Sequence, residues 1–255
     1  MKILPSKILL LVGVFFIISF TNAQEINPDL LSDSVLYKKI LSGGVIVHTQ
    51  GFGACFQKGD NVSSLKTNFY EFSFVGMKSP KQIRSINPYF TNAKSYVYGK
   101  LNSVYFLRGG IGRSHLLNRK PYFGGVELRL SYSGGASIGF AKPIYLYVIN
   151  FTSNPYEYTI STEKYDEDEH FYDNIYGRAP FTEGIDETKI YPGIYGRASL
   201  SFEFGPYKSK VNTLNAGAYF EIFPQGIKIM AFTDPKRFFF NLFLSYSFGK
   251  RYNKY

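Results

Sequence analysis

The densest group of side chains able to do chemistry lies in a strongly acidic segment. Between Glu157 and Glu187 the sequence holds ten acidic residues and two basic ones, Lys164 and Arg178. Within it, Asp166, Asp168 and His170 offer the carboxylate and imidazole ligands that metal ions use. The run lacks the ligand spacing and the turn glycine of an EF-hand loop. Because runs of charge are usually solvated, we keep these three only as weak metal candidates and expect a solvated loop with no cofactor.

Histidine and serine raise the alternative of a hydrolase. The chain has three histidines, His48, His115 and His170. Nucleophilic catalysis needs a serine, a histidine and an acid within reach of one another. Ser114 and His115 are neighbours in sequence, so on a strand they point to opposite faces. No nucleophile elbow, zinc-protease helix, phosphate loop or dinucleotide fingerprint occurs, and we therefore expect no catalytic residues and no enzyme.

The N-terminus predicts export. Lys2 and Lys7 precede an apolar stretch from Ile8 to Phe20, and small residues end at Ala23. This pattern is typical of a cleaved signal peptide over 1–23, because the apolar stretch is too short to span a bilayer. An exported chain is not expected to meet nucleic acid, so we expect its basic residues to pair with lipid phosphates.

Composition favours strands. Of 255 residues, 45% are apolar and 18% aromatic, with 25 Phe, 22 Tyr and no Trp, and the formal net charge is +10. The apolar share excludes a disordered chain, and aromatic residues suit the pleated surface of a sheet. The single Cys55 excludes an intramolecular disulfide framework. After the signal peptide no apolar run is long enough for a transmembrane helix, so a membrane-embedded chain must form a closed β-barrel.

Several segments alternate apolar and polar residues as barrel strands do. Over 237–249, for example, Phe238, Phe240, Leu242 and Leu244 alternate with polar residues. We predict an all-β, antiparallel, up-and-down transmembrane barrel of about eight strands, at 44–57, 64–77, 98–116, 124–134, 137–150, 194–205, 214–231 and 236–249. The segment 44–57 does not sort cleanly by face. Gly134-Gly135 is read as a tight turn, although the alternation continues across it and one long strand over 124–150 remains open.

The strand count gives a domain plan. Residues 1–23 are the signal peptide, 24–40 a periplasmic arm, 41–249 the barrel and 250–255 a basic periplasmic tail. With both termini periplasmic, 151–193 becomes one long acidic extracellular loop, since such barrels carry their long loops outside. The segment 78–97 then falls on the periplasmic side, where its length is unusual.

The alternation also predicts a balanced charge network inside the barrel. Its members are Glu71, Lys100, Arg108, Glu127, Arg129, Arg197, Glu203 and Glu221. The lumen of an eight-stranded barrel is only wide enough for side chains to fill it, and buried charges persist when they are paired. We therefore expect cross-strand ion pairs and a closed interior that does not conduct ions.

The architecture over 41–249 resembles the small eight-stranded outer-membrane barrels of the OmpA and OmpX kind. The resemblance implies a barrel with a structural or adhesive role. Three stretches, 92–102 (NAKSYVYGKLN), 125–147 with YSGGASIGFAKPIYLY, and 170–198 with DNIYGRAPFTEGIDETKIYPGIYGRA, are similar to a group of Bacteroidota outer-membrane proteins. That group supplies no activity to transfer to particular residues.

These observations predict an integral outer-membrane β-barrel with a structural, scaffold or interaction role. One form of it is an accessory subunit of an outer-membrane assembly or secretion machine. Expected partners are outer-membrane lipid and a protein bound through loop 151–193 or segment 78–97. The alternatives are a barrel-embedded hydrolase or acyltransferase acting on lipid or peptide, and a secreted soluble β-protein.

Overall fold

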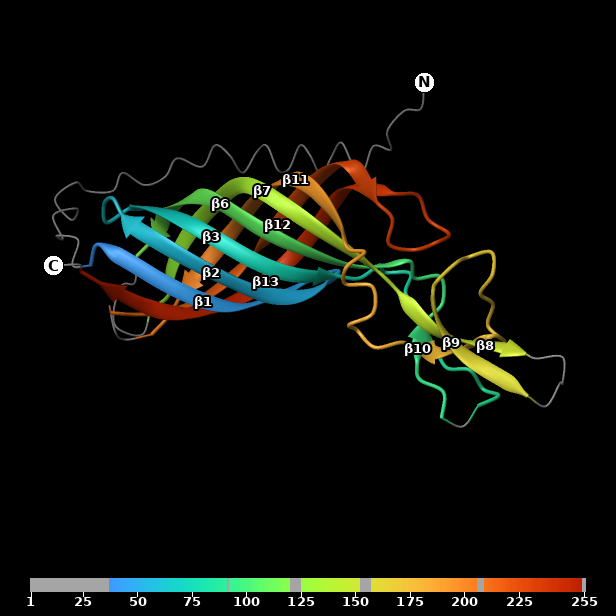
Figure 1. Cartoon of the computed structure of the whole chain (residues 1–255). Coiled ribbons are helices and arrows are strands. Elements are labelled where there is room, and N and C mark those ends of the chain that lie inside the picture. Colours follow the sequence, from blue (N-terminus) through green and yellow to red (C-terminus); the bar gives the residue numbers. More distant parts are fainter. Residues whose placement is uncertain (1–36, 91, 120–124, 152–156, 206–208, 254–255) are drawn as a thin grey trace, which may run out of the picture. The chain divides into compact units, whose positions relative to one another are not determined.

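The computed structural model describes residues 37–90, 92–119, 125–151, 157–205 and 209–253. The regular elements in these ranges are strands (Figure 1). No helix among the described residues is long and apolar enough to cross a membrane. The predicted signal peptide, 1–23, and the predicted arm up to residue 36 lie outside the described ranges.

Eight antiparallel strands close into a barrel (Figure 1). They pair in sequence order, and the last strand pairs with the first. The predicted fold class is therefore confirmed. The strands are β1 (Lys39–His48), β2 (Gly51–Asn61), β3 (Lys66–Met77), β6 (Asn102–Asn118), β7 (Glu127–Pro143), β11 (Lys189–Glu203), β12 (Lys210–Ile227) and β13 (Lys236–Tyr252).

The two ends of the barrel differ in their connections. Because neighbouring strands run in opposite directions, the connections 49–50, 78–101, 144–188 and 228–235 share one end, here called the loop end. The opposite end, here called the terminal end, holds the start of β1 and the end of β13. The long connections all belong to the loop end, as in outer-membrane barrels, where the longer loops gather at one side.

Two small sheets form within the loop-end connections. β4 (Arg84–Ser85) pairs with β5 (Tyr96–Val97). β8 (Tyr145–Phe151), β9 (Tyr158–Lys164) and β10 (Ile175–Arg178) form a three-stranded sheet in the order β10-β8-β9, here called the loop-end sheet. Backbone hydrogen bonds link the connections to one another, from Leu101 N to Ile229 O at 3.1 Å and from Ala231 N to Gly99 O at 2.7 Å.

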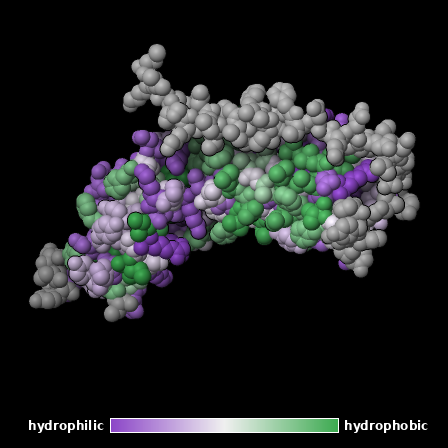
Figure 2. Space-filling view, turned by 180° about the vertical axis from the view of Figure 1, so that it is seen from behind, coloured by the Kyte–Doolittle hydropathy of each residue, from purple (hydrophilic) through white to green (hydrophobic). Residues whose placement is uncertain are grey.

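The barrel wall separates an apolar outer face from a filled interior. On β13 the outward side chains from Phe238 to Phe248 are between 41% and 61% exposed, whereas the inward ones from Phe239 to Ser247 are at most 4% exposed. Figure 2 shows hydrophobic side chains on the face of the barrel that is turned toward the viewer. This strict alternation is what a strand needs when one face meets lipid and the other a packed core.

The predicted single strand at 44–57 was wrong, because the segment is a hairpin. β1 and β2 are joined by the two residues Thr49 and Gln50, and His48 pairs directly with Gly51. A two-residue turn leaves even positions facing inward on β1 and odd positions facing inward on β2. That change of parity explains why the segment did not sort by face as one strand.

The predicted turn at Gly134-Gly135 was also wrong, because β7 runs through it. Gly134 pairs with Ile111 and Gly196, and Gly135 pairs with Gly110 and Tyr195. A Cβ at Gly135 would lie 2.2 Å from the Gly109 carbonyl oxygen, so the glycine here permits close approach of strands. The remainder of the segment, Tyr145–Phe151, is β8 of the loop-end sheet.

The two errors cancelled in the strand count but not in the placement of loops. The prediction missed the turn at Thr49-Gln50 and added one at Gly134-Gly135, so it still gave eight strands. The strands between these two points were predicted to run in the wrong direction. Segment 78–97, predicted on the same side as the termini, lies instead at the loop end together with 151–193. Its length is then no longer unusual, since it belongs to the end that carries the long connections.

Strand ends also differ from the prediction by a few residues. β1 begins at Lys39, inside the predicted arm, and β13 continues to Tyr252, inside the predicted basic tail. The extra residues pair with each other, Lys39 with Tyr252 and Ile40 with Arg251, so they extend the closure of the barrel toward the terminal end.

Candidate functional site: the barrel interior and the loop end

A buried ion pair crosses the middle of the barrel between β6 and β12. Arg108 donates to both carboxylate oxygens of Glu221, from Nε to Oε1 at 2.9 Å and from Nη2 to Oε2 at 3.0 Å. Both side chains are at most 1% exposed. Ser137 Oγ donates a further hydrogen bond to Glu221 at 3.0 Å, and the Arg108 guanidinium lies 4.2 Å from the Tyr219 ring centroid. The two charges compensate each other, as burial in low dielectric demands, and among the described residues Arg108 Nη1 has no hydrogen-bond partner.

A second ion pair lies beside the first. Arg197 Nη1 of β11 contacts Glu71 Oε2 of β3 at 2.5 Å. The other oxygen of Glu71 accepts hydrogen bonds from Ser133 Oγ at 2.6 Å and Tyr195 Oη at 2.8 Å. These two pairs, here called the ionic layer, connect strands on different sides of the barrel. The four charged side chains of the ionic layer pair with one another, and together with their neighbours they fill the lumen.

The remaining residues of the predicted network lie apart from the ionic layer. Glu127 pairs with Arg129 at 2.6 Å on β7. Glu203 pairs with Arg251 of β13 at 2.5 Å, a partner that the prediction missed because it ended the strand at 249. The inward odd positions of β13 continue through Ser247 to Arg251, and this periodicity was the signal that could have found it. Lys100 is not on the barrel wall: it precedes β6 and bridges to Met230.

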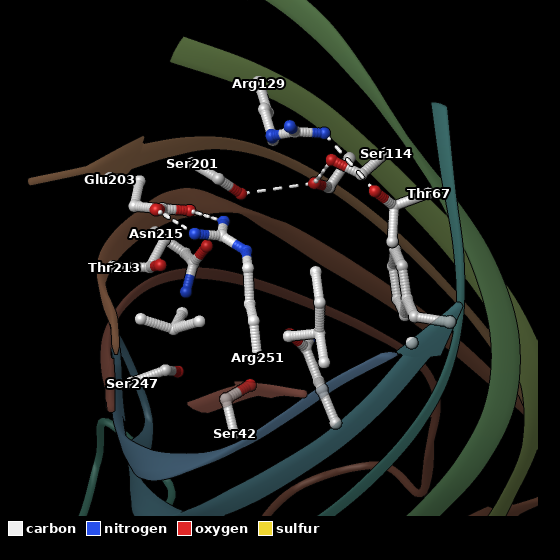
Figure 3. Close-up of a pocket in the computed structure, with 16 residues that line it drawn as sticks. Ser42, Thr67, Ser114, Arg129, Ser201, Glu203, Thr213, Asn215, Ser247 and Arg251 are labelled. Carbon is white, nitrogen blue, oxygen red and sulfur yellow. Dashed lines mark hydrogen bonds and ion pairs between the residues drawn. The ribbon is translucent and has the colours of Figure 1, made fainter. Parts of the chain in front are cut away.

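A polar cavity opens in the lumen on the terminal side of the ionic layer. Its volume is about 80 Å³. Figure 3 shows Glu203 and Arg251 paired on one side of it and Arg129 reaching toward Thr67 on the other. Among described residues its lining includes the polar side chains Ser42, Gln57, Thr67, Ser114, Arg129, Ser131, Ser201, Glu203, Thr213, Asn215, Ser247 and Arg251. A volume of this size holds several waters, each needing roughly 10–15 Å³, and the wall supplies their hydrogen bonds.

An apolar plug fills the lumen on the loop side of the ionic layer. Phe106, Phe223 and Phe239 are at most 1% exposed. Their rings pack together, with centroids 4.8 Å apart for Phe106 and Phe223 and 5.1 Å apart for Phe106 and Phe239. The plug consists of Val75, Met77, Val104, Phe106, Ala141, Phe223, Ile227, Ile229, Met230 and Phe239. It closes the lumen with packed carbon at the end where the long connections begin.

The metal candidates of the acidic segment form a hydrogen-bonded turn. Asp166 N–H donates to His170 Nδ1 at 2.8 Å, and Asp168 N–H donates to Asp166 Oδ1 at 3.0 Å. His170 is 2% exposed, and its Nε2 lies 3.2 Å from Glu163 Oε2. In the described ranges no three His, Cys, Asp or Glu side chains are grouped to hold a metal ion. The three candidates are therefore not brought together as ligands, and backbone N–H groups occupy Asp166 Oδ1 and His170 Nδ1.

The three histidines are the residues on which the hydrolase alternative depends. Ser161 Oγ and His170 Nε2 both contact Glu163, so the carboxylate lies between the serine and the imidazole. These hydrogen bonds lower the pKa of Glu163, with the one from Ser161 contributing most. The base in contact with Ser161 is therefore a carboxylate of lowered pKa, which is a weak base, and the imidazole of His170 does not contact the serine.

The serine and histidine at 114–115 point to opposite faces of β6, as predicted. Ser114 is inward and accepts a hydrogen bond from Ser131 Oγ at 3.0 Å. His115 is outward, with Nε2 3.2 Å from Tyr132 Oη. His48 Nδ1 accepts from the Gln50 backbone N–H at 3.3 Å. In the described part of the chain, no histidine is hydrogen-bonded to a serine or cysteine.

Comparisons with known proteins concern the fold. No family model matches the sequence, and no curated protein matches it. Two solved structures are similar to this chain. One is Ail, the attachment invasion locus protein of Yersinia pestis, at 9% identity and a TM-score of 0.42, covering 85% of this chain and 99% of Ail. The other is Neisserial surface protein A (NspA), at 9% identity and a TM-score of 0.38, covering 85% of this chain and 96% of NspA.

The resemblance to small eight-stranded barrels is thus confirmed as an architecture. The closed ring of eight antiparallel strands carries that conclusion. The similarity of 92–102, 125–147 and 170–198 to a Bacteroidota group stays a prediction.

Proposed function

We propose that this protein is an integral outer-membrane β-barrel that does not conduct and that presents its loop end to partners. The observation that carries the proposal is a closed barrel with an apolar outer face and a filled lumen. In lipid every backbone polar group must be satisfied internally, and a closed barrel does so. The ionic layer and the apolar plug support a lumen closed to ions, because paired charges and packed apolar side chains fill it among the described residues.

The loop end supplies the interaction surface of the proposal. Asn87 Nδ2 donates to the Ile175 carbonyl oxygen at 2.8 Å and so holds segment 86–89 against 172–175. The apolar side chains around this contact are exposed: Ile83 75%, Ile86 61%, Tyr89 75%, Phe171 56% and Tyr172 52%. Exposed apolar groups with aromatic anchors are typical of protein interfaces. A role as accessory subunit of an outer-membrane assembly or secretion machine is the specific form that we propose to test.

Membrane integration is tested by washing membranes with carbonate or urea. We expect the protein to stay in the pellet and to show a folded band on gels run without heating. Release into the wash would contradict the barrel in lipid and favour the secreted soluble alternative. Planar-bilayer recording of the purified protein is expected to show no stable conductance steps, and reproducible openings would contradict the closed lumen.

The interaction role is tested by capture from solubilised outer membranes with wild type and the variant I86E/Y89E. We expect a specific partner to be captured by wild type and not by the variant, because two charged carboxylates replace apolar side chains in the contact surface. The control I111E/L107E changes outward side chains of β6 and should instead disturb membrane insertion. Equal capture by wild type and I86E/Y89E would contradict binding through this surface.

A further inference from the structure

Cations gather at the loop-end rim of the barrel. Strand pairing brings them there from distant parts of the sequence. Arg84 pairs with Val97, shortly before Lys100, and Lys142 pairs with Ser103, shortly after it. Arg178 pairs with Leu146, which follows Lys142 on the chain. With Lys78, which directly follows β3, these residues form a group here called the rim cluster: Lys78, Arg84, Lys100, Lys142 and Arg178.

The rim cluster has no carboxylate partner in ion-pair contact among the described residues. Elsewhere in the structure the buried guanidinium groups have one, as Arg108 has Glu221 and Arg197 has Glu71. Lys142 is only 6% exposed, yet its Nζ donates to the Pro143 carbonyl oxygen at 3.3 Å and to no carboxylate. The negative charge of Glu183 acts on Lys142 without forming an ion pair with it. A buried cation without a counter-charge is costly, so the cluster as it stands is incomplete.

The position of the cluster indicates which anion completes it. Lys78 Nζ lies 5.5 Å from the Phe52 ring centroid, and Lys142 Nζ lies 5.0 Å from that of Phe181. Phe52 is outward on β2, and Phe181 packs edge-on against Tyr105, which is outward on β6. Aromatic side chains at this level mark the boundary between hydrocarbon and headgroups, where lysine and arginine reach phosphate.

The charge on Lys100 supports the same conclusion. Its burial, and then the positive charges of Lys78, Arg178, Arg84 and Lys142, lower the pKa of Lys100 to about 8. A phosphate bound among these side chains would offset their repulsion. Figure 2 shows the hydrophobic surface of the barrel giving way to hydrophilic side chains toward the loop end.

We propose that the rim cluster is a binding site for the phosphate groups of a phosphorylated lipid in the surrounding leaflet. The proposal rests on the proposed function, since the lipid must surround the barrel. It adds a defined partner and a defined place, with headgroup phosphate against Lys78, Arg84, Lys100, Lys142 and Arg178 and acyl chains against the outward aromatic residues.

The test uses the full-length mature protein in neutral detergent micelles with diphosphoryl lipid A as the probe, and native mass spectrometry measures the lipid retained. We expect wild type to retain lipid and K78Q/R84Q to bind it roughly 25-fold more weakly, about fivefold for each charge removed. Both side chains are exposed, so the variant should fold, and its unheated gel band verifies this. The control K58Q/K66Q removes two exposed outward charges near the terminal end and should bind as wild type does.

Two results would overturn the proposal. Equal retention by wild type, K78Q/R84Q and K58Q/K66Q would show that the cluster is not the site. Displacement of the lipid by inorganic phosphate at an equal concentration would show that the acyl chains add nothing to binding and that the lipid assignment is wrong. A protein that washes out of membranes would contradict the proposed function, whereas a membrane-bound protein with equal retention would contradict this inference alone.

Discussion

The two halves of the barrel lumen are filled by different kinds of side chain. On the terminal side of the ionic layer, serine, threonine and asparagine surround a cavity of about 80 Å³. On the loop side, Phe106, Phe223 and Phe239 pack against one another. Both halves lie inside the same eight strands, so the barrel itself does not dictate the filling. The polar half suits hydration from the terminal end, and the apolar half provides a dry base for the loop-end connections.

The comparison implies that equal changes of charge have unequal costs in the two halves. In a site without water, removal of one partner leaves the other charge with neither a counter-charge nor solvent. The full desolvation penalty of that charge then lowers the free energy of unfolding. Beside a hydrated cavity, water replaces part of the lost interaction. The predictions below test this difference, and the unfolding free energies are to be measured by urea titration of the folded barrel in micelles, with tyrosine fluorescence as the signal.

The largest effect is expected in the ionic layer. Glu221→Leu should lower the unfolding free energy by about 3–5 kcal/mol, because it leaves Arg108 buried without a counter-charge. The double variant R108M/E221L should recover most of that loss, since apolar residues of similar size replace both charges. A loss below about 1 kcal/mol in the single variant would show that water reaches this layer.

The apolar plug should be nearly as sensitive. Phe223→Ala is expected to cost about 3 kcal/mol, because it opens a cavity in packed aromatic residues. The matched control is Phe238→Ala, whose side chain is 55% exposed on the outer face and is replaced there by detergent or lipid. The control should cost about 1 kcal/mol or less. Equal costs would contradict a tightly packed loop half.

The polar half should tolerate the loss of a charge better. Arg251→Gln removes the partner of Glu203 beside the cavity and is expected to cost about 1–2 kcal/mol. Lys250→Gln makes a similar charge change on the outer face next to it and should cost little. If Arg251→Gln cost as much as Glu221→Leu, the two halves would not differ in hydration and the comparison would fail.

The smallest effect concerns Lys100 and appears as a dependence on pH. Burial and neighbouring cations lower its pKa to about 8, against about 10.4 for an unfolded chain. The cost of this charge is therefore fully present below pH 8 and disappears as pH rises toward 10.4. Relative to Lys100→Met, wild type should gain about 1 kcal/mol of unfolding free energy between pH 7 and pH 10, a figure reduced for solvent screening.

The quantity to measure is the difference in unfolding free energy between wild type and Lys100→Met, because the effect of tyrosine titration is the same in both and cancels. The experiment is done in neutral micelles without anionic lipid, since a bound phosphate would raise the pKa of Lys100. A difference that does not change with pH would contradict the incomplete rim cluster.

Short-range pattern in the sequence determined the fold class and the facing of most residues. Side chains alternate with a period of two on a strand, so Phe238 to Phe248 and their polar neighbours assign the two faces of β13 without knowledge of its partners. The same periodicity predicted that Glu71, Arg108, Arg197 and Glu221 face inward. The N-terminal signal peptide and the Bacteroidota resemblance are also read from the sequence and stay predictions.

Turns were harder, because local sequence does not distinguish a glycine that bends the chain from one that lets strands approach. Gly134-Gly135 reads as a turn, but its neighbours Gly110 and Gly196 on the adjacent strands show that it allows close packing. Thr49-Gln50 carries no glycine or proline and yet makes the tightest hairpin. Only the paired register separates these cases.

Which charges meet was decided by tertiary structure alone. Arg108 and Glu221 are far apart in sequence, and their contact follows from the closure of the barrel. The same closure places segment 78–97 and the acidic segment at one end, and it collects the rim cluster there from the end of β7 and from separate connections. Periodicity assigns a side chain to a face, but the register between strands sets its height in the barrel and therefore its partner.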